Sequence, residues 1–426
     1  MARFVGVRHG RIAVVSDASF DHDEMDVMEI SDDLGSIHSS DLITNCQVKN
    51  GAVKCRAVKK PLSELKVAFV SNWKMRCGIA TYAEHLYPEI TKHLNHFKLF
   101  IERNDLPTGN VMRMGDRIMS EDRVVVCWKR GESLRKLVEE LHAYDPDIIL
   151  VNHEFGIFPN ASYWLSMMGR LSDYRTITTM HSVFHHKDKT IVEAAMSEII
   201  VHQEGGKQVL AEEKGLSSTI HIVPHGCYAY RDDRLWNFYH SDKTIVQFGF
   251  LFRYKGWQLA LEAVALLKEK HPDVFFTGLC SESPYAKLEH QVYYNELMEL
   301  ASKLGILENI SLLRGYRSDR VLSSFLRTNK VALFPYVSSP EHEVWGASGA
   351  ARLAMAAGMP VITSSCNHFL DLPTIKAETA EQMAIELDGL FSDPTLAAEQ
   401  IAKQKAYVLE NTWEKVAQKY LDIFAG

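Results

Sequence analysis

Two cations stand in a loop where they could bind a phosphorylated ligand. Arg253 and Lys255 belong to the segment VQFGFLFRYKGW, whose apolar run is closed by Gly249 and followed by a helical pattern. This pattern predicts a buried strand, a loop that carries both cations, and then a helix. Basic residues in loops are usually solvated, so an ordinary surface turn stays open as the alternative for this segment taken alone.

A second segment, about ninety residues later, places acids at the same kind of position. It predicts a strand, a loop with Glu341 and Glu343, a GASGA turn with Ser348 and Gly349, a helix and another strand. Ligands of open parallel sheets bind beyond the carboxyl ends of the strands, where both loops would lie. Backbone N–H groups at a helix start can bind an anion. The alternative is that the small residues only let the helix pack closely on the sheet.

Three residues in the first half of the chain also follow predicted strands. Gly78, in CGIATY, would begin a long helix where a phosphate or an acceptor could approach the backbone closely. A plain turn glycine is the alternative. His153 and Glu154 follow the apolar segment DIILVN, where side chains point into the crevice of a parallel sheet. A lone histidine is more often structural, but this position favours a functional role.

Metal binding is not the favoured interpretation of the histidines, cysteines or acids. His181, His185 and His186 could form a cluster, but we expect an acceptor-side loop there, with His181 facing the acceptor. Seven cysteines are scattered without a CxxC pair, which indicates reduced thiols in a cytoplasmic protein. Residues 17–34 hold eight acids and no Lys or Arg, without the glycine pattern of a calcium loop, and predict a solvated loop.

Composition indicates a globular protein with more than one core. The chain has 426 residues, of which 46% are hydrophobic and 24% charged, enough for two or three domains. No apolar run is long enough to span a membrane, and the N-terminus lacks the continuous apolar core of an export signal. The net charge of −7 does not favour a polyanion partner, although a local basic groove is compatible with it.

The pattern of predicted strands and helices changes twice along the chain. Residues 1–62 predict a small antiparallel β appendage of two hairpins, with Asn50-Gly51 as the strongest turn signal. Residues 63–235 and 236–408 each alternate strands with helices, which predicts an α/β protein with two doubly wound Rossmann-like domains. Residues 409–426 predict an amphipathic helix that packs back on the first domain.

Taken in order, the motifs from residue 64 onward resemble those of the family-4 retaining glycosyltransferases, which have the two-domain GT-B fold. The resemblance rests on these segments: VAFVSNWKMRCGIATYAEHL, VNHEFGIF, TMHS, IVPHG, FGFLFRYKGW, the acidic loop with AMAAGMPVI, and TWEKVAQKYLDIF. Each segment is weak alone. Seven of them in the family's order make a strong signal. The first 60 residues lie outside it.

The resemblance implies an enzyme that transfers a hexose or pentose, with retention, from a nucleotide-diphosphate sugar to a hydroxyl acceptor such as an envelope or other oligosaccharide. Arg253 and Lys255 would stabilise the leaving diphosphate in place of a metal, with no cofactor and a UDP-sugar favoured over a GDP-sugar. Glu343 would hold the sugar hydroxyls, and His153 would contact the transferred sugar or orient the acceptor hydroxyl. The further expected site residues are, on the donor side, Gly78, Gly249, Glu341, Ser348 and Gly349 and, on the acceptor side, Glu154 and His181.

One departure and three alternatives accompany this interpretation. The family's second glutamate, which holds the ribose, falls here at Arg352 or Leu353, so ribose binding must differ, through backbone groups or Ser348. A glycosyltransferase acting on hydroxymethylated bases of viral DNA would use WKMR, CWKRGESLRK and HHKDK as a phosphate-tracking groove. A sugar-nucleotide epimerase would need acids placed for proton transfer. A non-catalytic nucleotide-sugar binding protein would bind without turnover.

Overall fold

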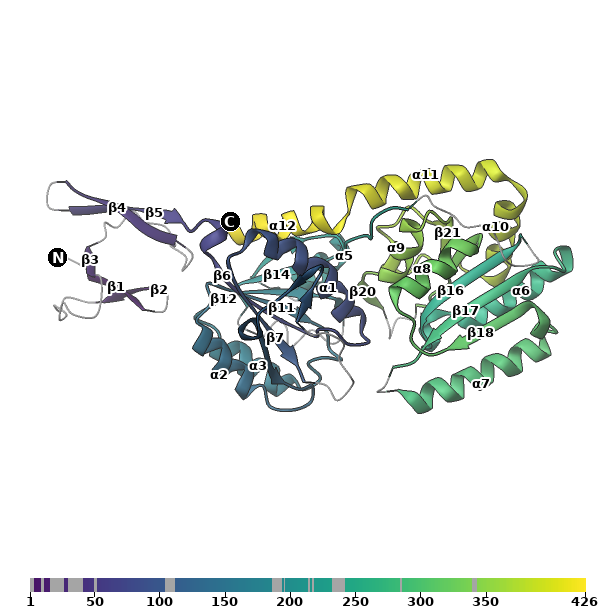
Figure 1. Cartoon of the computed structure of the whole chain (residues 1–426), viewed down its shortest axis with the longest axis horizontal. Coiled ribbons are helices and arrows are strands. Elements are labelled where there is room, and N and C mark those ends of the chain that lie inside the picture. Colours follow the sequence, from purple (N-terminus) through teal and green to yellow (C-terminus); the bar gives the residue numbers. More distant parts are fainter. Residues whose placement is uncertain are drawn as a thin grey trace. The chain divides into compact units, whose positions relative to one another are not determined.

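The computed structural model describes residues 4–8, 11–15, 27–29, 41–49, 52–103, 112–185, 194, 196–213, 215–216, 218–231, 242–283, 286–338 and 343–426, with only the backbone before residue 60. The chain divides into two compact units (Figure 1), one made of Met1–Val223 with Ala417–Gly426 and the other of Pro224–Val416. The predicted joint, before residue 236, falls on residues 232–241, which lie outside the described ones.

The core of the first unit is a sheet of seven parallel strands. Its order is β10-β7-β6-β11-β12-β14-β15. The strands are β6 (Lys66–Ser71), β7 (His96–Glu102), β10 (Val124–Trp128), β11 (Ile148–His153), β12 (Arg175–Met180), β14 (Glu198–Val201) and β15 (Thr219–Ile222). The order along the sheet reverses between β6 and β11, whose register pairs Ile148 with Val67. A crevice for a ligand forms at such a reversal, beyond the carboxyl ends of the strands.

Helices of the first unit begin at this carboxyl edge. They include α1 (Gly78–Ile90), α2 (Arg135–Tyr144), α3 (Ala161–Arg170) and α5 (Glu204–Gln208). Between β7 and β10 the described chain forms a small hairpin, β8 (Arg113–Met114) with β9 (Arg117–Ile118). Strand β11 is buried along its whole length, which explains why the sequence there is apolar without alternation.

The second unit repeats the topology with six parallel strands in the order β18-β17-β16-β19-β21-β22. They are β16 (Thr244–Phe250), β17 (Phe275–Ser281), β18 (Ile310–Arg314), β19 (Val331–Phe334), β21 (Val361–Thr363) and β22 (Ile375–Lys376). The helices include α6 (Trp257–Lys270), α7 (Lys287–Lys303), α8 (Asp319–Thr328), α9 (Gly349–Ala356), α10 (Ala380–Ser392) and α11 (Pro394–Glu410). Ile245 of β16 belongs to the core under α6, and Val246 and Phe248 to the core under α9.

The end of the chain belongs to the first unit from residue 417 onward. Helix α12 (Trp413–Ala425) buries its predicted apolar residues, among them Tyr420 and Phe424. Arg175 of β12 donates to the carbonyl oxygens of Phe424 at 2.9 Å and Ile423 at 2.6 Å. Tyr420 Oη lies 2.9 Å from Tyr82 Oη, which ties this helix to α1.

The appendage contains the two predicted hairpins and one strand that the sequence did not predict. Strands β1 (Phe4–Arg8) and β2 (Arg11–Val15) pair antiparallel, as do β4 (Asp41–Lys49) and β5 (Ala52–Lys59), with Lys49 opposite Ala52 on either side of Asn50-Gly51. Strand β3 (Val27–Glu29) pairs with β1, inside the acidic stretch that we expected to be a loop. Three residues are too few for alternation to reveal a strand. The fold class predicted from the sequence is confirmed.

Candidate functional site

A glycine fixes the loop that carries the two cations. The turn η5 (Arg253–Lys255) is followed by Gly256, whose φ is 69°. A Cβ atom at Gly256 would lie 1.6 Å from the carbonyl oxygen of Pro335, so a side chain cannot be accommodated. The Val337 N–H also donates to the Tyr254 carbonyl oxygen at 2.8 Å. The loop after β16 is therefore fastened to the loop after β19, beside the reversal of strand order.

Lys255 directs its ammonium group onto aromatic rings. Its Nζ lies 3.9 Å from the ring centroid of Tyr336 and 4.8 Å from that of Tyr254. No carboxylate of the described residues forms an ion pair with it. A cation held on aromatic faces keeps its charge and has N–H donors left for an anion. Lys255 is thus placed to bind a phosphate that enters at the carboxyl edge of β16.

Arg253 is already engaged within the second unit. Its Nη1 lies 2.6 Å from Oε2 of Glu296 on α7, and its guanidinium lies 4.7 Å from the ring centroid of Tyr293. The hydrogen bond to Glu296 raises the pKa of Arg253. The sequence suggested that Arg253 and Lys255 act as a matched pair. In the structure both Nη atoms of Arg253 are bound to Glu296, so they must leave this carboxylate before they can bind a phosphate.

The segment CNHF, residues 366–369, lies beside the loops after β16 and β19, and the sequence analysis missed it. It follows β21, and Asn367 Nδ2 donates to Oε1 of Glu343 at 3.0 Å. The His368 ring lies 6.3 Å from that of Tyr254 and 5.7 Å from that of Tyr336, centroid to centroid. Burial, with further contributions from Lys255 and Arg352, lowers the pKa of His368 to about 3, so its imidazole is neutral. The sequence signal that could have revealed this segment was its position after the predicted strand that became β21.

The start of α9 is capped by its own serine. Ser348 Oγ accepts from the Ala351 N–H at 3.3 Å and lies 3.4 Å from Tyr336 Oη. A Cβ atom at Gly349 would lie 3.5 Å from the His225 ring. Because the cap already uses one amide of α9 and the Ser348 hydroxyl, fewer groups are left for an anion than the sequence suggested. Gly249, with φ 139°, faces open space, and Glu341 lies outside the described residues.

Arg352 is one of the two residues at which the family's second glutamate was expected, and it is fully buried. Its guanidinium pairs with Asp371 and donates to the Ser348 carbonyl oxygen at 3.1 Å and to Tyr407 Oη at 3.2 Å. These contacts join α9 to α11. Because its guanidinium is bound by these groups of the protein, Arg352 has a structural role in this unit.

The start of α1 forms the open part of the edge in the first unit. Gly78 is its first residue, and no heavy atom lies within 4 Å of where a Cβ would stand. Burial raises the pKa of the half-buried Cys77 thiol, while the charge of Arg130 lowers it and that of Glu154 raises it. Arg130 and Glu154 therefore lie near the start of α1. Glu154 accepts from Ser182 Oγ at 2.6 Å.

His153 ends β11 as predicted, but its side chain is buried instead of open to the crevice, with 1% exposure. The ring stacks on Phe158 at a centroid distance of 5.7 Å and meets Trp164 edge-on at 4.5 Å. Burial lowers its pKa to about 3. Its Nδ1 atom is buried and has no partner among the described residues. The imidazole carries no charge near neutral pH, and with its Nδ1 buried it does not reach a ligand in this conformation.

His181 belongs to a buried chain of polar groups. Its Nδ1 lies 3.3 Å from His202 Nε2, and its Nε2 lies 3.3 Å from the Asn152 side-chain amide. His202 Nδ1 donates to the Val223 carbonyl oxygen at 3.0 Å. Burial and the neighbouring histidines lower the pKa of His181 well below its usual value. His181 is 8% exposed, and both of its ring nitrogens lie within hydrogen-bond distance of protein groups, so little of it is open to an acceptor. His186 lies outside the described residues.

A second buried polar cluster lies at the ends of β6, β7 and β10. Arg130 donates to both carboxylate oxygens of Glu102, each at 2.7 Å, and Asn72 Nδ2 also donates to Glu102. Asn72 Oδ1 is buried without a partner among the described residues. The sequence analysis missed this cluster because its members are far apart in the chain. Among the described residues no group of acids, histidines and cysteines could hold a metal ion, and no helix is long and apolar enough to cross a membrane.

Comparison with known proteins gives a family match for residues 231–420 and a fold for both units. No curated protein sequence matches the chain. The Anabaena protein HepE in complex with UDP and glucose is similar, with a TM-score of 0.63 and 13% identity over 85% of this chain and 100% of that one. The E. coli trehalose-6-phosphate protein bound with UDP-2-fluoro glucose has a TM-score of 0.63 and 12% identity over 84% and 99%. A glycosyltransferase from Rickettsia africae has a TM-score of 0.59 and 15% identity over 84% and 97%.

Identities this low establish the fold, and the sequence profile adds the activity. The profile of the family described as Glycosyl transferases group 1 matches residues 231–420, which include η5, Glu343 and the start of α9. The chain is therefore a glycosyltransferase of the GT-B fold, and residues 231–420, fewer than half of its residues, match the group 1 family model.

Proposed function

We propose that this enzyme transfers a sugar from a nucleoside diphosphate sugar to a hydroxyl acceptor with retention of the anomeric configuration, using Lys255 as the principal group that stabilises the leaving diphosphate. The observation that carries the proposal is the Lys255 ammonium, 3.9 Å from the Tyr336 ring centroid and in no ion pair among the described residues. It stands at the carboxyl edge of β16, where the strand order reverses and ligands of such sheets bind.

The chemistry explains why a cation is needed there. The acceptor oxygen forms a bond to the anomeric carbon while the bond from that carbon to the diphosphate oxygen breaks. The proton of the acceptor hydroxyl passes to the leaving diphosphate. Negative charge grows on the diphosphate during this step, and a fixed positive charge lowers the barrier. Arg253 would join Lys255 once the diphosphate has displaced Glu296.

The donor is proposed to be a UDP-sugar, since similar structures are described with UDP and glucose or with UDP-2-fluoro glucose. The acceptor is proposed to be an oligosaccharide bound by the first unit. Glu154 and His181 are its proposed contacts. His153 is proposed to hold the transferred sugar through an uncharged hydrogen bond once Phe158 and Trp164 have moved away from its buried ring. Glu343, oriented by Asn367, is proposed to receive hydroxyls of the donor sugar.

Thermal unfolding with added nucleotides tests the donor site, because a ligand that binds the folded state raises the apparent stability. UDP, GDP, dTDP, ADP and CMP are compared on the wild type, on Lys255→Ala and on Lys403→Ala, an exposed lysine of α11 that serves as control. We expect a shift with UDP that Lys255→Ala loses and Lys403→Ala keeps. A shift that Lys255→Ala retains in full would overturn the site. NMR of the glycoside product then gives the anomeric configuration, and inversion would overturn the retaining assignment.

A further inference from the structure

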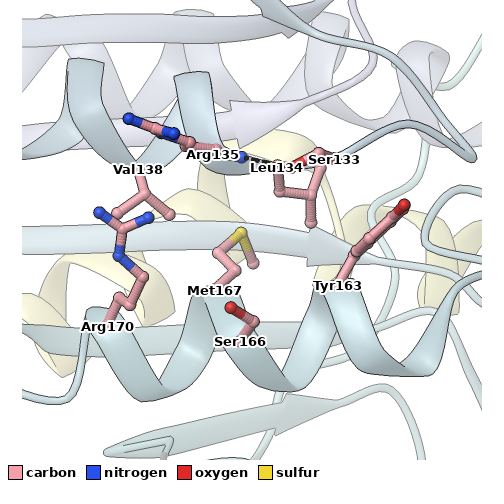
Figure 2. Close-up of a pocket in the computed structure, with 8 residues that line it drawn as sticks. All are labelled: Ser133, Leu134, Arg135, Val138, Tyr163, Ser166, Met167 and Arg170. Atoms are coloured by element: carbon pink, nitrogen blue, oxygen red, sulfur yellow. Dashed lines mark hydrogen bonds between the residues drawn. The ribbon is translucent and has the colours of Figure 1, made fainter.

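A small pocket on the first unit lies between α2 and α3, apart from the edge residues assigned above (Figure 2). Its floor is apolar and buried, made of Leu134 and Val138 at the start of α2 and Met167 of α3. The enclosed space of the pocket is about 40 Å³. Sites for whole drug-sized molecules are several times larger, so only a small group of a ligand, such as a carboxylate or a phosphate, would enter the pocket, and the rest of the ligand would lie over its open mouth.

Two guanidinium groups face this pocket and no carboxylate lines it. Arg135 Nε lies 2.7 Å from Glu139 Oε1 on the exposed side of α2, so this ion pair partly neutralises the Arg135 charge. Arg170, in the last turn of α3, has no ion pair or hydrogen bond from its side chain among the described residues. Exposed arginine forks of this kind match carboxylate and phosphate oxygens. The charge of the lining therefore favours an anionic group.

The remaining lining groups are hydroxyls. Ser133, Ser166 and Tyr163 contribute them, and the Tyr163 ring is 37% exposed. In Figure 2 the two guanidinium groups lie at one end of the pocket and the Tyr163 ring at the other. On α3 Tyr163 and Arg170 are seven residues apart, about 10 Å along a helix. An aromatic face, hydroxyls and a guanidinium at that spacing can hold a polar ring by its face, its hydroxyls and its acid group.

The direction of the helices links this pocket to the expected acceptor region. Both α2 and α3 begin at the carboxyl edge of the parallel sheet, after β10 and β11. Tyr163 and Ser133 lie at those beginnings, and Arg170 lies two turns further from the edge. A linear ligand that leaves the edge along α3 would meet the ring first and the guanidinium last.

From these observations we infer that the α2–α3 pocket is a binding subsite for an acidic sugar residue, a uronic acid or a sugar phosphate, belonging to the glycan that the enzyme elongates. The inference rests on the proposed function in taking a glycan as acceptor. It adds that this glycan is anionic and that its acid group is read by Arg170, outside the place of reaction.

Binding without turnover tests the subsite separately from the proposed function. Protein-observed NMR titrations compare a disaccharide that ends in glucuronate, the same disaccharide ending in glucose, glucose 6-phosphate and inorganic phosphate. The wild type, Arg170→Gln and the control Arg117→Gln, an exposed arginine of β9 away from the pocket, are titrated with each. We expect the two acidic saccharides to bind the wild type and Arg117→Gln, and to bind Arg170→Gln about tenfold or more weakly.

Three results would overturn the inference. One is equal binding of the glucose-ended and glucuronate-ended disaccharides. Another is unchanged binding in Arg170→Gln. The third is binding of inorganic phosphate without either acidic saccharide, which would make the pocket a simple anion site. Loss of UDP binding in the donor experiment would leave these titrations unaffected, so the failure of one proposal is distinguishable from the failure of the other.

Discussion

The two sheets have the same strand order around their reversal but use their carboxyl edges differently. At the edge of the second unit the Lys255 ammonium lies on the Tyr336 ring and forms no ion pair with the residues that the structure describes. In the first unit both histidines that the sequence suggested are buried. His153 is enclosed by aromatic rings, and His181 is part of a hydrogen-bonded chain.

This difference separates two ways of preparing a site. A charge that awaits a ligand is held by rings that cannot neutralise it, whereas a neutral group that awaits a ligand is kept uncharged by burial. The donor edge is therefore expected to respond to changes of charge, and the acceptor edge to changes of packing and pH. Four measurements can break or sharpen that contrast.

Loss of the Lys255 charge should have the largest effect. Lys255→Ala is expected to lower kcat/KM for transfer on the order of 100-fold, because the growing charge on the diphosphate loses its principal partner. Steady-state kinetics with a UDP-sugar measure it, with Lys403→Ala as the control that keeps activity. A tenfold or smaller loss would show that the donor edge does not depend on this charge.

Protonation of buried histidines should be the next largest effect. The folded pKa of His153 is about 3, below the value of about 6.5 expected when unfolded, so below pH 6.5 the unfolded chain binds more protons. The stability from burying this ring neutral is present at pH 7.5 and falls as pH drops, by about 2 kcal/mol at pH 5 for one histidine. His181, with its pKa lowered in the same direction, adds to the slope.

Urea unfolding at pH 7.5, 6 and 5 measures this slope. His153→Gln should flatten it, whereas His96→Gln, at an exposed residue of β7, should leave it unchanged. The same slope in His153→Gln as in the wild type would mean that this ring is not the buried neutral group described here.

Substitutions at two glycines should distinguish a glycine needed to avoid a steric clash from a glycine needed for the close approach of a ligand. Gly256→Ala places a Cβ against the Pro335 carbonyl oxygen at positive φ and is expected to cost about 1–3 kcal/mol of stability. Gly78→Ala meets no atom within 4 Å and should leave stability within about 0.5 kcal/mol while lowering activity. Urea unfolding and kinetics on both variants give the comparison. Full activity in Gly78→Ala would remove the proposed close approach of a ligand at α1.

The smallest effect should come from the Arg253 ion pair. Because Arg253 and Glu296 are both largely exposed, Glu296→Gln is expected to leave the unfolding midpoint unchanged. If Arg253 turns to the diphosphate, the same variant should tighten UDP binding about two- to fivefold, as the competing carboxylate is gone. Calorimetric titration with UDP measures this. Weaker binding would show that Glu296 instead positions Arg253.

The sequence predicted the fold better than it predicted the site. Apolar runs such as DIILVN and TIVQFGF predict strands buried on both faces, and the structure has β11 and β16 there. Strand β22, two residues long, left no periodic signal. The loop position of Lys255 was readable because a cation after a strand is a local pattern. The sequence did not reveal that the Lys255 ammonium forms no ion pair with the described residues, since its place depends on Tyr336, which lies far away in sequence.

The residues that the sequence misassigned or missed depend on contacts between distant segments. The enclosure of His153 requires Phe158 and Trp164 to fold back from α3. The capture of Arg253 requires α7 to bring Glu296 alongside. Arg352 was readable as a departure from a pattern, but its partners Asp371 and Tyr407 were not. Charge type is a local property of sequence, and charge neutralisation is a property of packing.

The membership of residues 417–426 in the first unit has a consequence for biosynthesis. Arg175, Thr179 and Tyr82 receive partners from Tyr420, Ile423 and Phe424. On a ribosome that adds about 5–20 residues per second, residues 224–416 take about 10–40 s to make. During that interval the seven-stranded sheet is exposed to the cell without its final helix. The second unit is synthesised later, but all of its residues are present before residues 417–426 of the first unit have been added. The first part of this enzyme to be synthesised is thus the last to be completed.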